Sequence, residues 1–386
     1  MMAALTEERG RIKVAVGMSG GVDSSVCAYL LKQQGYDVIG TTMRLWEDEE
    51  EACTRAGHVG CCGQSAVEDA MRICAGLGIP FHVFSLQETF RREVVDYFCR
   101  SYLSAETPNP CIACNRFLKW QALREKAAQL GADFIATGHY ARIHRTAEGR
   151  YAIGRSKDAR KDQSYVLYPL TQDDLAHTLL PLGDYEKEQV RAIAAEAGLP
   201  VANKPDSQDI CFVPDGDYAA FLERQVGAEL VNRPGSFVMD GRTVGQHKGI
   251  VHYTIGQRKG LGLSLGRPVF VNQVRADTNE VVLGDEEKCF ADALVAEDVI
   301  MQSVAGFDAE ATYVGRIRYS DRGTPCRVRQ MEDGKIKVCF LEPVRAITPG
   351  QAVVIDDGTL VVGGGRILGS CLPGEESSES FGRAHI

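Results

Sequence analysis

The chain has 386 residues, too many for one compact hydrophobic core, so its length predicts two or three domains. Hydrophobic residues make up 44% of it and charged residues 25%, which is ordinary for a globular protein. A net charge of −9 excludes binding of nucleic acid through the overall field, so any such contact must come from local basic segments. No segment has the length and apolarity of a membrane span or a secretion signal, so we expect no membrane partner.

The thirteen cysteines are many and odd in number. Without a secretion signal they predict a reducing compartment, which we expect to be the cytoplasm, and thiols that react or bind metal. Cys53, Cys61 and Cys62 follow the acidic run 47–51 in a glycine-rich stretch. Their role stays open, because adjacent cysteines rarely ligate one ion without further spaced partners.

The first motif predicts a strand, a glycine turn and the beginning of a helix. An apolar run ends at Gly17 and is followed by Met18, Ser19, Gly20, Gly21, Val22, Asp23, Ser24 and Ser25. Such a turn lets backbone N–H groups approach a phosphate, and the helix dipole adds positive potential there. An ordinary turn between strand and helix also favours glycine and serine, but the full string is much more specific. No Gly-Lys-Ser/Thr closes the loop, which excludes the kinase-type phosphate loop.

This string resembles the pyrophosphate loop of the N-type ATP pyrophosphatases. The resemblance implies that residues 17–24 bind ATP by its β- and γ-phosphates and that Asp23 places Mg²⁺. A second strand predicted over residues 36–43 completes a βαβ unit and hence a doubly wound parallel sheet. Met43 would end that strand beside the adenine pocket, although core packing explains a methionine there equally well.

Further elements follow from hydrophobic periodicity. Helices are predicted over residues 65–77, 90–102, 117–130 and 184–197, and strands over 80–84 and from Asp133 to the string Thr137-Gly138-His139. Glycine-punctuated runs after about residue 221 predict a small β-rich linking domain, and the short strands after about 291 predict a β-barrel. We therefore expect an α/β domain at 1–220, a linking domain at 221–291, a barrel at 292–373 and a disordered tail at 374–386.

Cys111 and Cys114 form a Cys-x-x-Cys between the rigid segment 107–110 and the helix predicted from residue 117. A helix N-terminus lowers the pKa of nearby thiols. A redox pair, two metal ligands and buried small side chains are the alternatives, and the proline-rich presentation makes burial the weakest. Because two thiols do not complete a metal site, a metal would need a ligand from elsewhere. Cys211, in the polar loop 203–212, is expected to converge on the same crevice.

Basic residues are concentrated in two regions. Lysine and arginine outnumber acidic residues between Arg142 and Lys161, which predicts contacts with a phosphate backbone. The arginines that make the C-terminal region basic, and so suited to RNA, are Arg316, Arg318, Arg322, Arg327 and Arg329. His139 lies at the predicted ligand edge of the sheet, where we favour a structural role over a catalytic one.

Seven strings occur in a fixed order along nearly the whole chain. They are residues 19–25 (Ser-Gly-Gly-Val-Asp-Ser-Ser), 107–115 (Thr-Pro-Asn-Pro-x-x-x-Cys-Asn), 136–142 (Ala-Thr-Gly-His-Tyr-Ala-Arg), 161–165 (Lys-Asp-Gln-Ser-Tyr), 207–212 (Ser-Gln-Asp-Ile-Cys-Phe), 256–262 (Gly-Gln-Arg-Lys-Gly-Leu-Gly) and 349–354 (Pro-Gly-Gln-Ala-Val-Val). With these strings the chain resembles the tRNA-specific 2-thiouridylases.

The resemblance implies ATP-dependent 2-thiolation of the wobble uridine, position 34, in tRNAs for Lys, Glu and Gln. It implies that Met43 and Gly138 join the loop in binding ATP, that uridine O2 is adenylated and that AMP then leaves. Cys211 would carry a persulfide supplied by a cysteine desulfurase or a sulfur-relay protein, and Cys114 would cleave it, which forms a Cys114–Cys211 disulfide. The implied tRNA contacts are Asn109, Pro110 and Cys111 at the target base, and Lys161, Asp162, Gln163, Arg318 and Tyr319; no DNA partner is implied.

One position departs from the family pattern. Many members have aspartate where this chain has Cys111. Three thiols, at Cys111, Cys114 and Cys211, could instead hold a [4Fe–4S] cluster whose remaining iron binds hydrosulfide. The sequence leaves the persulfide and the cluster equally open.

Two other functions share part of the pattern. A synthetase that transfers ammonia would use the same loop but has no need for the three cysteines or for a basic β domain. A non-catalytic RNA-binding protein has no need for an intact pyrophosphate loop. The sequence therefore favours the thiolating enzyme over both.

Overall fold

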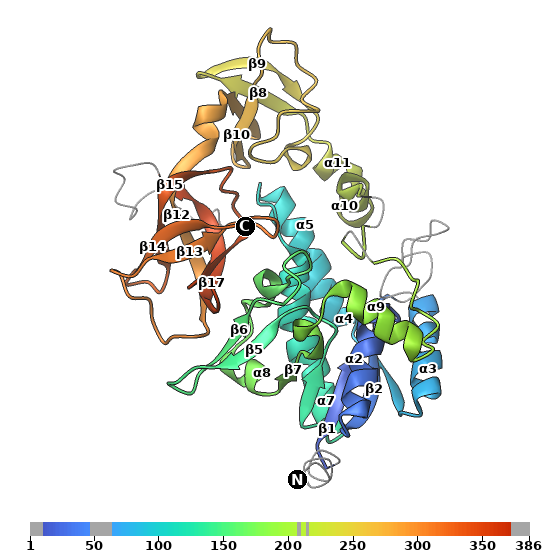
Figure 1. Ribbon diagram of the computed structural model, residues 1–386. Helices are drawn as coiled ribbons and strands as arrows, with labels where there is room; N and C mark the ends of the chain where they lie inside the picture. Colours follow the sequence, from blue (N-terminus) through green and yellow to red (C-terminus); the bar gives the residue numbers. More distant parts are fainter. Residues whose placement is uncertain (1–10, 47–63, 207–209, 214–215, 372–386) are drawn as a thin grey trace. The chain divides into compact units, whose positions relative to one another are not determined.

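The computed structural model describes residues 11–46, 64–206, 210–213 and 216–371 (Figure 1). They form two compact units. Of the described residues, the first unit contains those up to Val94, those in Cys111–Gly216 and Thr359–Val361, and the second contains Val95–Pro110, those in Asp217–Gly358 and those from Val362. The four segments expected from the sequence, with their three boundaries, stay a prediction. The acidic run 47–51, the three cysteines that follow it and the tail 374–386 lie outside the described residues.

The first unit is built on a five-stranded sheet in the order β3-β2-β1-β4-β7. All four of its pairings are parallel. The strands are β1 (Lys13–Gly17), β2 (Asp37–Arg44), β3 (Phe81–Ser85), β4 (Phe134–Ala136) and β7 (Thr178–Leu179). The chain adds β2 and β3 on one side of β1 and returns to add β4 on the other. In such sheets ligands bind at this change of direction, beside the carboxyl ends of the strands.

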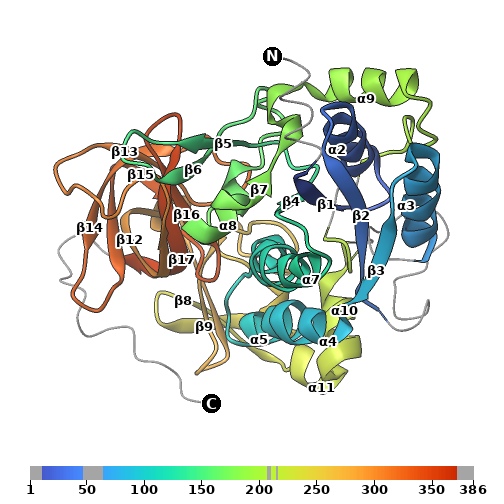
Figure 2. The ribbon, with the colours of Figure 1, turned by 90° about the horizontal axis from the view of Figure 1, so that it is seen from below.

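Helices cover both faces of this sheet, which confirms the predicted doubly wound fold. Val14 and Val16 of β1 share a core with α2 (Val22–Gln33), α3 (Gln64–Leu77) and α9 (Lys187–Glu196). Gly17 faces the opposite side and lies near Leu123 of α7 (Leu123–Gln129). Figure 2 shows α2 and α9 on one side of β1 and α7 on the other.

Short elements complete the first unit. They are α4 (Gln87–Phe90), the π-helix η1 (Arg91–Val95), the hairpin β5 (Arg142–Arg145) and β6 (Tyr151–Gly154), η3 (Ser164–Leu167), α8 (Gln172–Ala176) and η4 (Pro181–Asp184). Residue 95 of η1 already belongs to the second unit.

The helix expected from Phe117 begins earlier, so that expectation was wrong. Helical turns run without a break through α6 (Pro110–Ala113), the π-helix η2 (Cys114–Ala122) and α7. A proline suits the first position of a helix, because its missing N–H would have no partner inside the helix. Cys111 and Cys114 therefore lie in the first turns of the helix instead of before it.

The second unit contains two β structures, as the sequence predicted. A four-stranded sheet has the order β10-β11-β8-β9, and a closed barrel has the order β12-β15-β14-β13-β16-β17. The sheet consists of β8 (Gly235–Met239), β9 (Arg242–His247), β10 (Phe270–Arg275) and β11 (Glu280–Gly284). The barrel consists of β12 (Phe290–Met301), β13 (Tyr313–Arg316), β14 (Thr324–Gln330), β15 (Ile336–Arg345), β16 (Ala352–Asp356) and β17 (Val361–Cys371).

Alternation along the strands produces the barrel core. In β14, Cys326 and Val328 are buried while Arg327 and Arg329 are exposed, as expected for a strand with one face inward. The remaining elements of this unit are α5 (Asp96–Leu103), α10 (Tyr218–Val226), α11 (Ala228–Val231), η5 (Ile250–His252) and η6 (Glu286–Cys289). Within the described ranges, no helix combines the length and the apolar character needed to cross a membrane.

The segment before the Cys-x-x-Cys is held by the barrel's turn 349–351. The Thr107 N–H donates to the Pro349 carbonyl at 2.8 Å, and the Gln351 side chain donates to the Thr107 carbonyl at 2.8 Å. Gly350 has φ +86°, and a Cβ there would lie 2.9 Å from Cβ of Glu106. The string 349–354 thus has a structural role, because its turn holds the segment that leads to Pro110.

An ion pair is buried in the barrel. Arg316 Nε lies 3.2 Å from Asp356 Oδ2, and the two side chains are 5% and 1% exposed. Arg316 therefore does not belong to a basic surface as the sequence suggested. Arg318 does not present all of its guanidinium to solvent either, since Nη2 donates to the carbonyl of Arg345.

We expect Asp356→Asn to destabilise the protein by about 3–5 kcal/mol, because it removes the carboxylate charge beside the buried Arg316 guanidinium. The measurement is the midpoint of urea unfolding followed by circular dichroism. Asp333→Asn is the matched control, since its ion pair with Lys335 lies at an exposed turn and its loss should leave the midpoint unchanged. Equal midpoints for the two variants would contradict the assigned role of the buried pair.

Candidate active site

The pyrophosphate loop lies between the end of β1 at Gly17 and the beginning of α2 at Val22. Gly20 has φ +67°, and a Cβ there would lie 2.5 Å from the carbonyl oxygen of Ala66, so only glycine fits. The Ser19 N–H donates to Ser24 Oγ at 3.1 Å, and Ser24 Oγ donates to the Gly21 carbonyl at 3.2 Å. The loop is therefore folded back over the first turn of α2, where backbone N–H groups and the dipole favour an anion.

The loop residues named from the sequence divide into two groups. Met18 and Val22 are 3% and 4% exposed and belong to the core, and the Met18 N–H donates to the Thr41 carbonyl at 2.7 Å. Ser19, Gly21 and Asp23 are only partly buried. A ligand approaching the loop would meet this second group.

Gly138, in the segment after the neighbouring strand, lies directly against the pyrophosphate loop. It follows β4, and a Cβ at this position would lie 2.7 Å from the Asp23 carbonyl carbon and 2.8 Å from the Ser24 nitrogen. Gly138 therefore allows the two segments to touch. Met43 is half-buried near the end of β2, where it pairs with Phe84 of β3.

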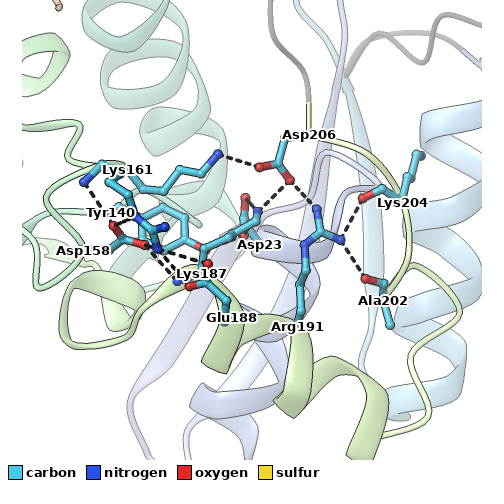
Figure 3. Close-up of polar contacts among 11 residues, drawn as sticks. Asp23, Tyr140, Asp158, Lys161, Lys187, Glu188, Arg191, Ala202, Lys204 and Asp206 are labelled. Carbon is cyan, nitrogen blue, oxygen red and sulfur yellow. Dashed lines mark hydrogen bonds and ion pairs between the residues drawn. The ribbon is translucent and has the colours of Figure 1, made fainter.

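A network of ion pairs centres on Lys187, at the beginning of α9 (Figure 3). Its ammonium lies 2.7 and 2.8 Å from the two carboxylate oxygens of Asp23 and 2.8 Å from Asp206 Oδ1. Lys161 Nζ donates to Asp206 Oδ2 at 2.8 Å, and Arg191 Nη2 donates to Asp206 Oδ1 at 2.8 Å. Three cations thus surround two carboxylates, and the excess positive charge suits a polyphosphate.

Hydrogen bonds fix the protonation of this network. The Tyr140 hydroxyl donates to Asp23 Oδ1 at 2.7 Å, and burial together with the Asp23 charge raises the pKa of Tyr140, so the phenol keeps its proton. Burial alone would raise the pKa of Asp206, but hydrogen bonds from Lys161 and Lys187 outweigh it and the pKa is lowered. Asp206 is therefore a carboxylate at neutral pH.

Lys204 ties the loop 203–206 to the pyrophosphate loop. Its ammonium donates to the Gly20 carbonyl and to Asp69 Oδ2, each at 2.8 Å. Arg191 binds the carbonyls of Ala202 and Lys204 at 2.8 and 3.1 Å. The chain that leads to Cys211 is therefore anchored at residues 202–206.

The three candidate thiols differ in exposure. Cys111 is exposed, whereas Cys114 and Cys211 are half-buried. Cys211 is followed by Phe212, a buried ring that packs edge-on against Phe90 at 5.8 Å. Across the described residues, no three side chains of histidine, cysteine, aspartate or glutamate are placed so that they could hold a metal ion. The thiols as placed therefore do not fit a cluster site.

His139 is part of a buried polar cluster. Its Nδ1 lies 2.7 Å from Thr137 Oγ1 and its Nε2 lies 3.4 Å from Lys119 Nζ, which also donates to Asn115 Oδ1 at 2.8 Å. Since an ammonium can only donate, we assign the His139 proton to Nδ1. Burial and then the Lys119 charge lower the pKa of His139, so it stays neutral at neutral pH. This geometry favours the structural role that the sequence suggested.

The residues expected to contact tRNA fall into two groups. In the first unit, Lys161 binds Asp206, Asp162 Oδ2 accepts from the Ser156 N–H at 2.7 Å, and Gln163 Oε1 accepts from the Tyr140 N–H at 2.9 Å. These contacts are internal and support the network. Cys111 also belongs to the first unit and is exposed. The other four lie in the second unit: Asn109 half-buried, Pro110 buried, Arg318 near Arg345, and Tyr319 48% exposed.

The basic segment 142–161 is largely matched by acidic side chains. Arg142 Nε lies 2.6 Å from Asp184 Oδ1, and Arg160 Nη2 lies 3.0 Å from Glu188 Oε1. The basic residues of this segment are therefore largely compensated, in the folded structure, by acidic side chains from elsewhere in the chain.

The sequence did not single out Lys187, Arg191 or Tyr140 as site residues. Tyr140 and Asp206 lie in or beside quoted strings, but nothing there marked them as partners of Asp23. One signal for Lys187 existed, because a lysine at the beginning of a helix opposes the dipole and is unfavourable without an anion.

Comparison with known proteins agrees with this geometry. A tRNA-specific 2-thiouridylase of Lachnoclostridium phytofermentans is 53% identical over 92% of this chain and 99% of its own length. The chain belongs to the tRNA-specific 2-thiouridylase family. Members from Clostridium perfringens and Carboxydothermus hydrogenoformans are each 51% identical, over 92% and 93% of this chain and 98% of their own lengths.

Three family profiles also match the chain of this thiouridylase family member. They are described as the tRNA methyl transferase HUP domain, over residues 12–215, the tRNA methyl transferase PRC-barrel domain, over 220–285, and the aminomethyltransferase beta-barrel domain, over 294–367. The first profile covers the sheet, the pyrophosphate loop and Cys211.

We expect Gly138→Ala to weaken ATP binding by about tenfold or more, because the new Cβ would force Asp23 and Ser24 away from β4. The measurement is the dissociation constant of a fluorescent ATP analogue. Gly76→Ala in α3 is the matched control, since a Cβ there meets open space and alanine is the better helix former. If Gly138→Ala bound ATP with wild-type affinity, the role assigned to Gly138 would be contradicted.

Proposed function

We propose that this protein is a tRNA-uridine 2-sulfurtransferase. It uses ATP to place sulfur on C2 of the wobble uridine, position 34, in tRNAs for Lys, Glu and Gln, and it releases AMP and pyrophosphate. The observation that carries this proposal is the physical link between the pyrophosphate loop and the chain of Cys211, through Asp23, Lys187 and Asp206. The reaction needs the activated uridine oxygen and the sulfur nucleophile close together. This link joins the loop proposed to bind ATP to the segment that leads to Cys211.

The loop supports adenylation. The Ser19 hydroxyl, the Gly21 N–H and the first turn of α2 are proposed as donors to the β- and γ-phosphates, and Gly138 lets the segment after β4 lie directly against Asp23 and Ser24. The Asp23 carboxylate provides the oxygen ligands that Mg²⁺ prefers, and the metal would neutralise phosphate charge there. Uridine O2 then attacks the α-phosphate and pyrophosphate leaves, which makes C2 electrophilic.

Two cysteines support the transfer of sulfur. The terminal sulfur of a Cys211 persulfide attacks C2, and the C2–O bond to AMP breaks. The Cys114 thiolate then attacks Cys211 Sγ, which leaves the sulfur on C2 and forms the Cys114–Cys211 disulfide. An external thiol must reduce that disulfide before the next turnover. Cys114 lies in the first turns of a helix, where the dipole favours its thiolate.

The partners follow from this chemistry. A cysteine desulfurase or a sulfur-relay protein supplies the persulfide sulfur, and the reducing cytoplasm suits both thiols. The target uridine must leave its stack to reach Cys211. Asn109, Pro110 and Cys111 are proposed beside that base, and Arg318 and Tyr319 beside the tRNA. Lys161, Asp162 and Gln163 are proposed to act through the network in addition to any contact with tRNA.

The profile descriptions speak of methyl transfer, whereas the named relatives are thiouridylases. The site supports the relatives' activity, because a loop of this kind holds the phosphates of ATP. The tRNA dependence of pyrophosphate release separates this function from a synthetase that uses ammonia.

We expect Cys114→Ser and Cys211→Ser each to lose tRNA thiolation by about a thousandfold or more, because each removes one sulfur of the relay. The measurement is mass spectrometry of 2-thiouridine in digested tRNA, with a desulfurase and cysteine as the sulfur source. Cys339→Ser is the matched control, since Cys339 is exposed on the barrel. Full activity in either of the first two variants would exclude the relay.

A [4Fe–4S] cluster at Cys111, Cys114 and Cys211 is the alternative sulfur chemistry. The arrangement of the described residues does not support it, so we derive no step through a cluster. We expect protein purified without oxygen to contain much less than one iron per chain, and Cys111→Asp to retain thiolation. About four irons and four sulfides per wild-type chain, lost in Cys111→Asp, would overturn the persulfide relay in favour of the cluster.

A further inference from the structure

The ammonium of Lys187 lies in a cluster of carboxylate oxygens. Three carboxylate oxygens surround it: Asp23 Oδ1 at 2.7 Å, Asp23 Oδ2 at 2.8 Å and Asp206 Oδ1 at 2.8 Å (Figure 3). The Lys187 side chain is only 7% exposed. Carboxylate oxygens around one point are also the ligands of hard divalent cations. An ammonium here competes directly with a metal ion for Asp23.

The two carboxylates do not depend on Lys187 equally. Asp206 also forms ion pairs with Lys161 and Arg191, each at 2.8 Å, so its charge is compensated without Lys187. For Asp23, the only other side-chain donor in the part of the chain that the structure describes is the neutral hydroxyl of Tyr140. Lys187 therefore supplies the counter-charge of Asp23.

Placing a lysine here has an energetic cost. The side chain is desolvated, and it stands at the N-terminus of α9, where the helix dipole opposes a cation. Three close carboxylate contacts offset that cost. A neutral side chain would avoid it but would leave Asp23 free to take a cation from solution.

We propose that Lys187 closes Asp23 to divalent cations until ATP arrives, so that the metal enters only together with the nucleotide. This inference rests on the proposed function, in which Asp23 is the metal ligand. A divalent cation alone would have to displace the ammonium while Lys161 and Arg191 remain close by, and like charges would repel it. The triphosphate brings several negative charges, to which the Lys187 ammonium can turn while it keeps Asp206.

The consequence is an ordered site. Asp23 stays paired with Lys187 in the absence of nucleotide, and it becomes a metal ligand when phosphate oxygens complete the coordination of the ion. Lys187 is thus a positioning residue for Asp23.

The test measures the binding of Mn²⁺ to the full chain in the absence of nucleotide. Binding is detected as a loss of the electron paramagnetic resonance signal of unbound Mn²⁺. We expect the wild type to show no specific site without nucleotide, and to bind Mn²⁺ when a non-hydrolysable ATP analogue is added. Lys187→Met should gain one site, with affinity at least about tenfold above that of the wild type. Adding Asp23→Asn to Lys187→Met should abolish the gain.

Lys161→Met is the matched control, because it removes a cation from Asp206 but leaves Lys187 on Asp23. It should bind no Mn²⁺ without nucleotide. Lys187→Gln repeats the test with a polar side chain in case the methionine variant does not fold, as judged by circular dichroism. A specific site in the wild type, no gain in a folded Lys187 variant, or an equal gain in Lys161→Met would each overturn the proposal. The measurement needs neither tRNA nor sulfur, so failure of thiolation alone would count against the proposed function and not against this inference.

Discussion

The ion pairs of Lys187 with Asp23 and Asp206 are the interaction on which the site depends. They connect the first turn of α2, the first turn of α9 and the chain that precedes Cys211. Asp23 is separated from Lys187 by 164 residues along the chain, yet the two side chains share contacts of 2.7 and 2.8 Å. Because buried charges are stable only when paired, each of these elements constrains the position of the others. Tyr140, which follows β4, donates its hydroxyl to Asp23, and Gln163 in turn accepts the Tyr140 N–H.

Local patterns were sufficient to predict the architecture of the first unit. An apolar strand, a glycine turn and the beginning of a helix depend on neighbours in sequence, and these were predicted correctly around residues 13–33. The network of Lys187 could not be predicted in the same way, because its partners come from distant segments and their approach depends on the packing of α9 against α2. The string 161–165 illustrates the limit: the family resemblance implied that Lys161, Asp162 and Gln163 contact tRNA, whereas in the fold all three also make contacts within the protein.

Charge counts along the sequence were similarly incomplete. Arg316 and Arg318 are separated by one residue, but the first is buried against Asp356 and the second binds a backbone carbonyl. A linear excess of arginine does not show which face of a strand each residue occupies. The beginning of the helix at Pro110 was missed for a related reason, because the prolines before Cys111 suggested an extended chain, while one of them is the first residue of the helix.

The turn 349–351 has a consequence for how this protein can be divided or recombined. Its hydrogen bonds hold Thr107, and two residues after Pro108 the chain enters the helix that carries Cys111 and Cys114. A fragment that ends near residue 216 would keep every element of the sheet and lose the partner of this segment. A chimaera that joined one relative's sheet to another's barrel would likewise need matching residues at 106–108 and 349–351. Segment 106–108 and turn 349–351 therefore have to be kept as a matched pair, although they are more than two hundred residues apart in the chain.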